Sequence, residues 1–364
     1  MLRLEPRGEF SRAWTYGSPL LAIVLTLITT ALIFAILGKD PGQALYTFFI
    51  KPLTTSDSAS ELLVKASPLI LIATGLSLGF RANVWNIGAE GQYTLGALAG
   101  GGLGLWFNNS HSGLVIPAMI VAGVLGGMAW AAIPAWLRTR FNANEILTSL
   151  MLTYVAQLIL IYLVTGPWRD PQGYGFPQSE MFNDVATIPI LISGTRLHLG
   201  VLIALLVVGL AWLLLGKSLV GFQLKVLGQA PRAARYAGFS NNKLIWFSLL
   251  LGGGLAGAAG LFEVSGPVGQ LTSQISPGYG FTAIIVAFLG RLHPVGVLFA
   301  GLLLALSYLG GEAAQIDLGL PGAVTGIFQG ILLFYLLGCD ILIHYRLRFG
   351  RPRTTLGTAA RPAA

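Results

Sequence analysis

The chain has 364 residues, of which 54% are hydrophobic and only 10% are charged. Because a soluble globular domain carries about 25% charged residues, this composition excludes a soluble protein and predicts an all-α protein that crosses a membrane many times. A net charge of +8 would suggest nucleic acid in a soluble chain. Here the basic residues fall in short loops and both tails, so we expect a lipid bilayer and no nucleic acid as partner.

Ten apolar runs are candidates for membrane spans, since about 20 residues at 1.5 Å per residue cross a core of about 30 Å. The three N-terminal arginines and the first run resemble a signal peptide, but that run is long enough to span and no small-residue cleavage site closes it. It is therefore predicted to be a retained helix. The predicted spans are 19–38, 62–80, 91–107, 114–137, 146–166, 197–216, 244–264, 280–289, 295–309 and 323–344.

Lysine and arginine alternate between rich and poor connections along these ten spans, which predicts both termini in the cytoplasm by the positive-inside rule. The predicted organisation is a cytoplasmic tail (1–18), a transmembrane domain (19–345) and a basic cytoplasmic tail (346–364). The longest basic connection, 217–243, then lies inside. The long connection 167–196 lies outside, as an interfacial cap or as a docking surface for an external partner.

Two segments break the apolar pattern in a similar way. The stretch 86–92 (NIGAEGQ) places polar residues where a membrane helix would carry aliphatic ones, and 280–289 is too short to cross unaided. Polar groups at that depth are costly unless they are satisfied within the protein. The correspondence predicts an inverted repeat of the second-to-fifth and seventh-to-tenth segments.

The polar residues of the spans are candidates for a translocation path. For Glu90 the alternative is a structural role at a helix start, where a carboxylate accepts backbone N–H bonds. Glu145 follows Asn144, a good N-cap, so helix capping is its alternative, and Glu263 lies near a span end, where it can face water. The candidates are Asn86, Glu90, Gln92, Glu145 and Glu263.

The inner connection 217–243 contains GQAPRAARYAG at 228–238. Proline suits the first position of a helix and glycine the residue past its end, so a short helix is predicted between Pro231 and Gly238. It is either a rigid knob that inserts into a partner or an interfacial helix whose arginines touch anionic lipid. The residues assigned to it are Pro231, Arg232, Ala233, Ala234, Arg235, Tyr236 and Gly238.

No catalytic or metal site is predicted. The four histidines are far apart in sequence, and Cys339, the only cysteine, excludes an internal disulfide and a cysteine-based metal site. The chain has no Walker-type glycine loop followed by Lys and Ser or Thr. We therefore expect no cofactor of its own; if ATP drives its activity, another subunit binds the ATP.

Four motifs together resemble one family. They are NIGAEGQ (86–92), NEILTSLML (144–152), GQAPRAARYAG (228–238), and GYGFTAI (278–284) leading to LGRLHP (289–294). In this order, over roughly residues 62–309, they resemble the permease subunit of ABC importers for simple sugars and nucleosides, the branch related to ribose and branched-chain amino acid permeases. The first and last motifs look most like the nucleoside branch.

This resemblance implies a permease that is not itself an enzyme, in a bacterial cytoplasmic membrane. It also implies three protein partners: a cytoplasmic ABC ATPase that binds ATP, a second, homologous permease as heterodimer partner, and an extracytoplasmic substrate-binding lipoprotein. The helix 231–238 maps onto the family's coupling helix, which docks on the ATPase. The alternative function is a secondary transporter in which Glu90, Glu145 and Glu263 carry protons.

Overall fold

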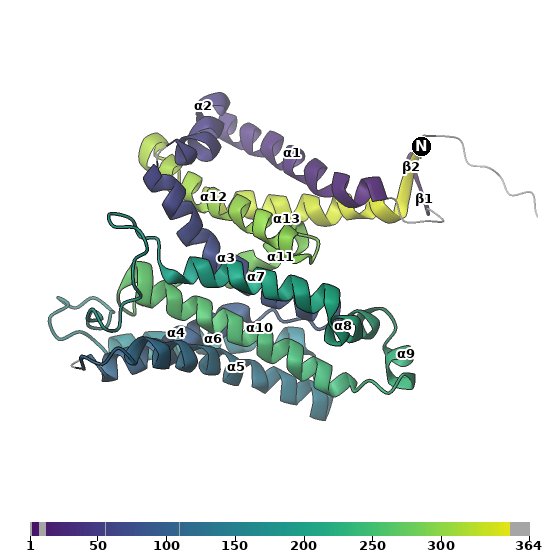
Figure 1. Ribbon diagram of the computed structural model, residues 1–364. Coiled ribbons are helices and arrows are strands. Elements are labelled where there is room, and N and C mark those ends of the chain that lie inside the picture. Colours follow the sequence, from purple (N-terminus) through teal and green to yellow (C-terminus); the bar gives the residue numbers. More distant parts are fainter. Residues whose placement is uncertain (1, 7–11, 55, 109, 350–364) are drawn as a thin grey trace, which may run out of the picture.

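The computed structural model describes residues 2–6, 12–54, 56–108 and 110–349 (Figure 1). Ten helices occupy the ten predicted segments. In the described part of the chain, eight of these are long and apolar enough to cross a membrane, and α4 and α11 are not among the eight. The ten are α1 (Arg12–Ile36), α3 (Ser56–Arg81), α4 (Ala89–Trp106), α5 (Val115–Phe141), α6 (Glu145–Thr165), α7 (Leu199–Lys217), α10 (Asn241–Glu263), α11 (Tyr279–Leu289), α12 (Pro294–Leu318) and α13 (Ala323–His344).

Shorter elements lie at the two ends of this bundle. At one end are α2 (Pro41–Leu45), the π-helix η1 (Tyr46–Ile50) and the 3₁₀ turn η2 (Lys51–Leu53); at the other are α8 (Leu219–Gln229) and α9 (Pro231–Tyr236). A π-helical turn, η3 (Val264–Val268), follows α10. Strands β1 (Leu2–Pro6) and β2 (Tyr345–Phe349) pair antiparallel, so the described ends of the chain lie together. Residues 350–364 of the predicted C-terminal tail lie outside the described residues.

Glycine-lined contacts hold α4, α5 and α10 together. A Cβ on Gly96 of α4 would lie 2.1 Å from Cα of Gly257 of α10, and one on Gly127 of α5 would lie 2.1 Å from the carbonyl oxygen of Gly253. Small residues allow such close backbone approach, which is a main source of helix association in lipid. The glycine-rich composition therefore reflects helices that pack backbone to backbone.

The helices α3 and α10 form the centre of the bundle. In the most apolar part of each helix, 83% of the residues of α3 and 67% of those of α10 are buried. The corresponding share is 22% in α1, α5 and α6. The first packs against α11 and α12, and the second packs against α4 and α5. Each of these two helices thus packs against the second and third helices of the other predicted repeat, α3–α6 or α10–α13. The inverted repeat itself stays a prediction.

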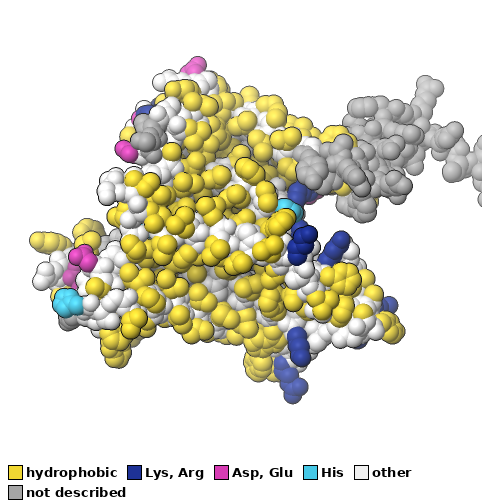
Figure 2. Space-filling view, viewed as in Figure 1, with side chains coloured by type: hydrophobic (Ala, Val, Ile, Leu, Met, Phe, Trp, Pro, Cys, Tyr) yellow, Lys and Arg dark blue, Asp and Glu magenta, His cyan; other side chains and the backbone are white. Residues whose placement is uncertain are grey.

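The helix α12 continues nine residues beyond its predicted end at 309. Glu312 pairs with Lys65 at 2.8 Å and Asp317 pairs with Lys51, so these carboxylates end the apolar run without ending the helix. It ends at Gly319, which has a φ of +63°, the left-handed conformation common just past a helix C-terminus. In Figure 2 hydrophobic side chains cover the middle of the bundle, and lysine and arginine gather toward the α8–α9 end.

Candidate functional site

The connection between α3 and α4 turns back into the bundle before α4 begins. Asn86 and Gln92 are both buried there and exchange two side-chain hydrogen bonds, of 2.7 and 3.0 Å. The Oδ1 atom of Asn86 also accepts the N–H of Gly88 at 3.1 Å. Two of the predicted path residues therefore satisfy each other and fix the shape of the loop.

Glu90 joins the N-termini of α4 and α11. Its side chain is buried, and Oε2 accepts the N–H of Gly280 at 2.6 Å. The first N–H groups of a helix have no partner within the helix, so Glu90 satisfies one such group of α11. A Cβ at Gly280 would lie 2.3 Å from the backbone nitrogen of Glu90. Only glycine therefore lets the two helix ends approach this closely.

A polar cavity of about 360 Å³ lies beside this junction. At 1.5 Å per residue, Glu90 is about 24 Å from the far end of α4 and Gly280 is about 14 Å from the far end of α11, so the cavity lies well away from both of these helix ends. Three elements form it: α4, α6 and the non-helical segment before α11. Its lining is Glu90, Thr94, Gln157, Leu160, Ile161, Ser273, Gln274, Ile275, Ser276 and Pro277.

Two predicted path residues lie elsewhere. Glu145 forms an ion pair with Arg138 and accepts the N–H of Trp85 at 3.4 Å. It therefore links the start of α6 to the end of α5 and to the α3–α4 connection. Glu263 is the last residue of α10 and does not line the polar cavity. Of the five candidates, the structure places only Glu90 in the cavity wall.

Sequence reasoning missed most of the cavity lining. Gln157 is a lone amide in an apolar stretch of α6, which was a usable signal, and Ser273, Gln274 and Ser276 belong to a polar run before a short helix. That run also caps the helix, because Oγ of Ser276 accepts the N–H of Tyr279 at 2.9 Å. The meeting of these residues with Glu90 depends on helix packing, which spacing alone does not reveal.

The long connection 167–196 is hydrogen-bonded to the segment that leads into the cavity wall. The N–H of Ser179 donates to the carbonyl of Leu271 at 2.8 Å, and the N–H of Ile188 donates to the carbonyl of Ser265 at 2.8 Å. The segment that carries these two carbonyls continues into the cavity wall. The connection 167–196 and the cavity lining are therefore joined by backbone hydrogen bonds.

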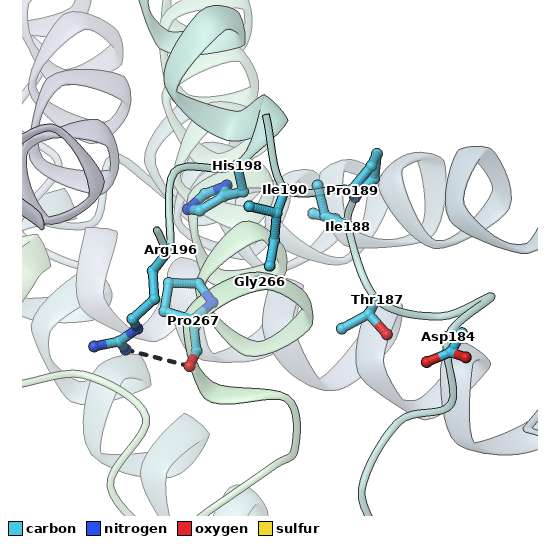
Figure 3. A pocket seen from close by; sticks show the side chains of 9 residues that line it. All are labelled: Asp184, Thr187, Ile188, Pro189, Ile190, Arg196, His198, Gly266 and Pro267. Carbon is cyan, nitrogen blue, oxygen red and sulfur yellow. Dashed lines mark hydrogen bonds between the residues drawn. The ribbon is translucent and has the colours of Figure 1, made fainter. Parts of the chain in front are cut away.

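A second cavity, of about 630 Å³, lies between this connection and η3 (Figure 3). Its wall includes His198, whose Nδ1 accepts the N–H of Gly200 at 3.1 Å and so caps α7. Arg196 donates to the carbonyl of Pro267 at 3.2 Å. Burial, and secondarily the charge of Arg196, lower the pKa of His198 to about 4. The imidazole is therefore a neutral helix cap at physiological pH.

The short helix predicted in the connection 217–243 is confirmed as α9, with Pro231 at its first position. Gly238 follows with a φ of +80°. Ala234 is buried, and Tyr236 is 94% exposed. The remaining assigned side chains, those of Pro231, Arg232, Ala233 and Arg235, are also exposed. The helix therefore presents its basic and aromatic side chains outward and is anchored through one alanine.

The helix α8, which sequence analysis did not predict, connects α9 to the polar site. Leu224 and Leu227 are buried in one apolar cluster with Ala82 and Val84 of the α3–α4 connection. At the end of α8 the backbone is so close to α3 that a Cβ on Gly228 would lie 2.0 Å from the carbonyl oxygen of Arg81. The helix α8 therefore packs directly against the connection that leads to Glu90.

Comparison with known proteins identifies the family. The family described as "Branched-chain amino acid transport system / permease component" matches residues 58–337. The glucose ABC transporter permease protein TsgB13 of Haloferax volcanii is 37% identical to this chain over 95% of the chain and 93% of that protein. The guanosine ABC transporter permease protein NupP of Bacillus subtilis is 31% identical, over 91% of the chain and 94% of that protein.

These relatives are transport subunits, and the prediction of an ABC importer permease is confirmed. The alternative of an ion-driven secondary transporter is not favoured. Such a permease works with an ATPase and other subunits. This chain therefore belongs to the branched-chain amino acid transport system permease family, as a multi-pass membrane subunit of an ABC transporter.

Proposed function

We propose that this permease imports nucleosides or related simple sugars, and that the polar cavity beside Glu90 is part of their path. The supporting observation is the cavity itself, which lies beside the buried Glu90 and offers hydroxyl, amide and carboxyl groups from α4, α6 and the segment before α11. Such groups match the many hydroxyls of a sugar or nucleoside. The relatives named for glucose and guanosine support the same substrate class.

A second, homologous permease completes this path in our proposal. Gln157 and Ile161 line the cavity and also belong to the exposed face of α6, which carries Tyr154 and Leu158 at 55% and 66% exposure. The cavity thus reaches the side of a single subunit. A partner packed on this face would enclose the cavity, as transport of a polar solute through lipid requires.

The ATPase docks on α9, and the α8–α9 end of the bundle faces the cytoplasm of a bacterium. Support comes from the exposed Arg232, Arg235 and Tyr236 on a helix with one buried anchor, and from the basic residues gathered at this end (Figure 2). Both tails then lie inside. An extracytoplasmic binding lipoprotein delivers substrate to the opposite end, where the outer loop is bonded to the cavity segment.

Uptake by a reconstituted transporter tests this proposal. Proteoliposomes that contain both permeases and the ATPase, with the lipoprotein supplied outside, should accumulate labelled guanosine or glucose only with internal ATP. Glu90→Ala should reduce that uptake. Labelled leucine is tested as a third solute. Uptake of leucine but not of guanosine or glucose, or uptake of any of these three solutes in the absence of the ATPase, would overturn the proposal.

Co-purification tests the docking of α9. The double variant Arg232→Ala, Tyr236→Ala should lose the ATPase from the purified complex while its melting temperature stays that of the wild type. The matched control is Arg169→Ala, Tyr174→Ala on the outer loop, where Tyr174 is 99% exposed. If both double variants retain the ATPase equally, α9 is not the docking element.

A further inference from the structure

An apolar groove lies between α1 and α12 at the α8–α9 end of the bundle. Its volume is about 790 Å³. Leu20 and Ile23 of α1 form one wall, and Phe299 and Leu303 of α12 form the other. Arg81 and His293 also line it. The groove therefore combines long apolar walls with basic side chains.

The dimensions of the groove match one leaflet of a bilayer. Leu20 and Phe299 are 65% and 66% exposed, so the groove opens sideways into the membrane. From Pro294, the first residue of α12, to Leu303 the helix rises about 14 Å at 1.5 Å per residue, and half of a hydrocarbon core of about 30 Å is about 15 Å. An acyl chain of the adjoining leaflet would extend along the full length of these walls.

The charges around the groove are not balanced. Arg291, which also lines it, is neutralised by Asp340 through two hydrogen bonds of 2.8 and 2.7 Å. Arg81 uses only Nε, which donates to the carbonyl of Leu292 at 2.9 Å, and it has no ion-pair partner among the described side chains. Among the described side chains, one positive charge beside the groove is thus left without a counter-charge.

His293 adds a polar group next to this arginine. Its side chain is exposed, and partial burial, followed by the positive charge of Arg81, lowers its pKa. The imidazole is therefore mostly neutral at physiological pH and can donate a hydrogen bond without adding repulsion between two cations. An arginine with free N–H groups beside a neutral donor is a suitable arrangement for a phosphate group.

We propose that this groove binds an anionic phospholipid, with an acyl chain between Leu20 and Phe299 and the phosphate against Arg81. The leaflet is that at the α8–α9 end; its assignment as the cytoplasmic leaflet rests on the orientation proposed above. The lipid would fill the space between α1 and the rest of the bundle. The site is separate from the polar cavity, so it can fail or succeed independently of the transport function.

Native mass spectrometry of the purified, delipidated permease tests this site. Phosphatidylglycerol and phosphatidylcholine with identical chains are added, and inorganic phosphate is a separate arm. Because one Arg near a bilayer surface contributes about 1 kcal/mol toward anionic lipid, we expect phosphatidylglycerol to bind about fivefold more tightly. Equal binding of the two lipids, or inorganic phosphate that displaces the bound lipid, would overturn the proposal.

Two groove variants and one control variant locate the binding site without touching Arg81. Leu20→Trp should fill the groove and reduce the binding of both lipids, while Leu32→Trp, at a 59% exposed position farther along α1, should not. Val295→Asp, at a groove position that is 42% exposed, should abolish the preference for phosphatidylglycerol.

Three results with these variants would count against the proposed lipid site. They are equal lipid binding by the two tryptophan variants, a retained preference in Val295→Asp, and a lipid-free dimer of the wild type that Leu20→Trp disrupts. The last would assign the groove to a second copy of the chain. Arg81→Gln, checked by its melting temperature, should lose the preference in the same way as Val295→Asp.

Discussion

Replacing Gly96 by alanine should separate α4 from α10. The new Cβ would lie 2.1 Å from Cα of Gly257 and 2.4 Å from its carbonyl oxygen, and ordinary contacts begin at 3.4 Å. The two backbones must therefore part by about 1.3 Å, the difference between 3.4 and 2.1 Å. Gly257 is also held from the other side, because a Cβ there would lie 2.3 Å from the carbonyl oxygen of Gly123 on α5. Since α10 cannot retreat freely, we expect a loss of about 1–3 kcal/mol, the usual cost of overpacking.

Thermal unfolding in detergent measures this loss. The matched control is Gly330→Ala on α13, where an added Cβ meets no atom within 4 Å, so that variant should melt at the wild-type temperature or slightly above it. Gly96→Ala should melt clearly lower and should also impair uptake, because Gly96 lies less than two turns from Glu90 on the same helix. If the two variants melt alike, close backbone packing of α4 on α10 is not a source of stability.

Two further predictions concern Glu90 and His198. Glu90→Ala leaves the N–H of Gly280 buried without a partner and should lower the unfolding free energy by about 1–3 kcal/mol. Glu90→Gln keeps an acceptor for this N–H and should melt near the wild-type temperature. Equal melting temperatures of the two variants would contradict the hydrogen-bond role of Glu90. His198 has a folded pKa of about 4 against an ordinary 6.5, so the folded state binds fewer protons between these values and stability should fall by about 3 kcal/mol as pH drops from 6.5 to 4. Melting curves across this range should show that slope in the wild type and not in His198→Asn, which keeps a capping side chain.

Local signals in the sequence were sufficient for the ten helices of the bundle and for α9. The ten predicted segments follow from runs of apolar residues, because a membrane helix satisfies its own backbone and needs little else from its surroundings. The helix α9 follows from a proline and a glycine at the right separation, because both act on their own backbone dihedrals. The helix α8 was missed because it is neither long nor bounded by such residues.

The sequence by itself therefore determined the class of protein, the positions of ten helical segments and, through four motifs, the family. Only the tertiary structure decided the roles of the polar residues: Asn86 and Gln92 bond to each other, Glu145 to Arg138, and Glu90 to Gly280, which is 190 positions away. The physical reason is that lipid solvates every apolar helix face about equally, so hydropathy says where helices are but not which faces meet. That choice rests on close glycine contacts and buried hydrogen bonds, which exist only once distant segments have packed together.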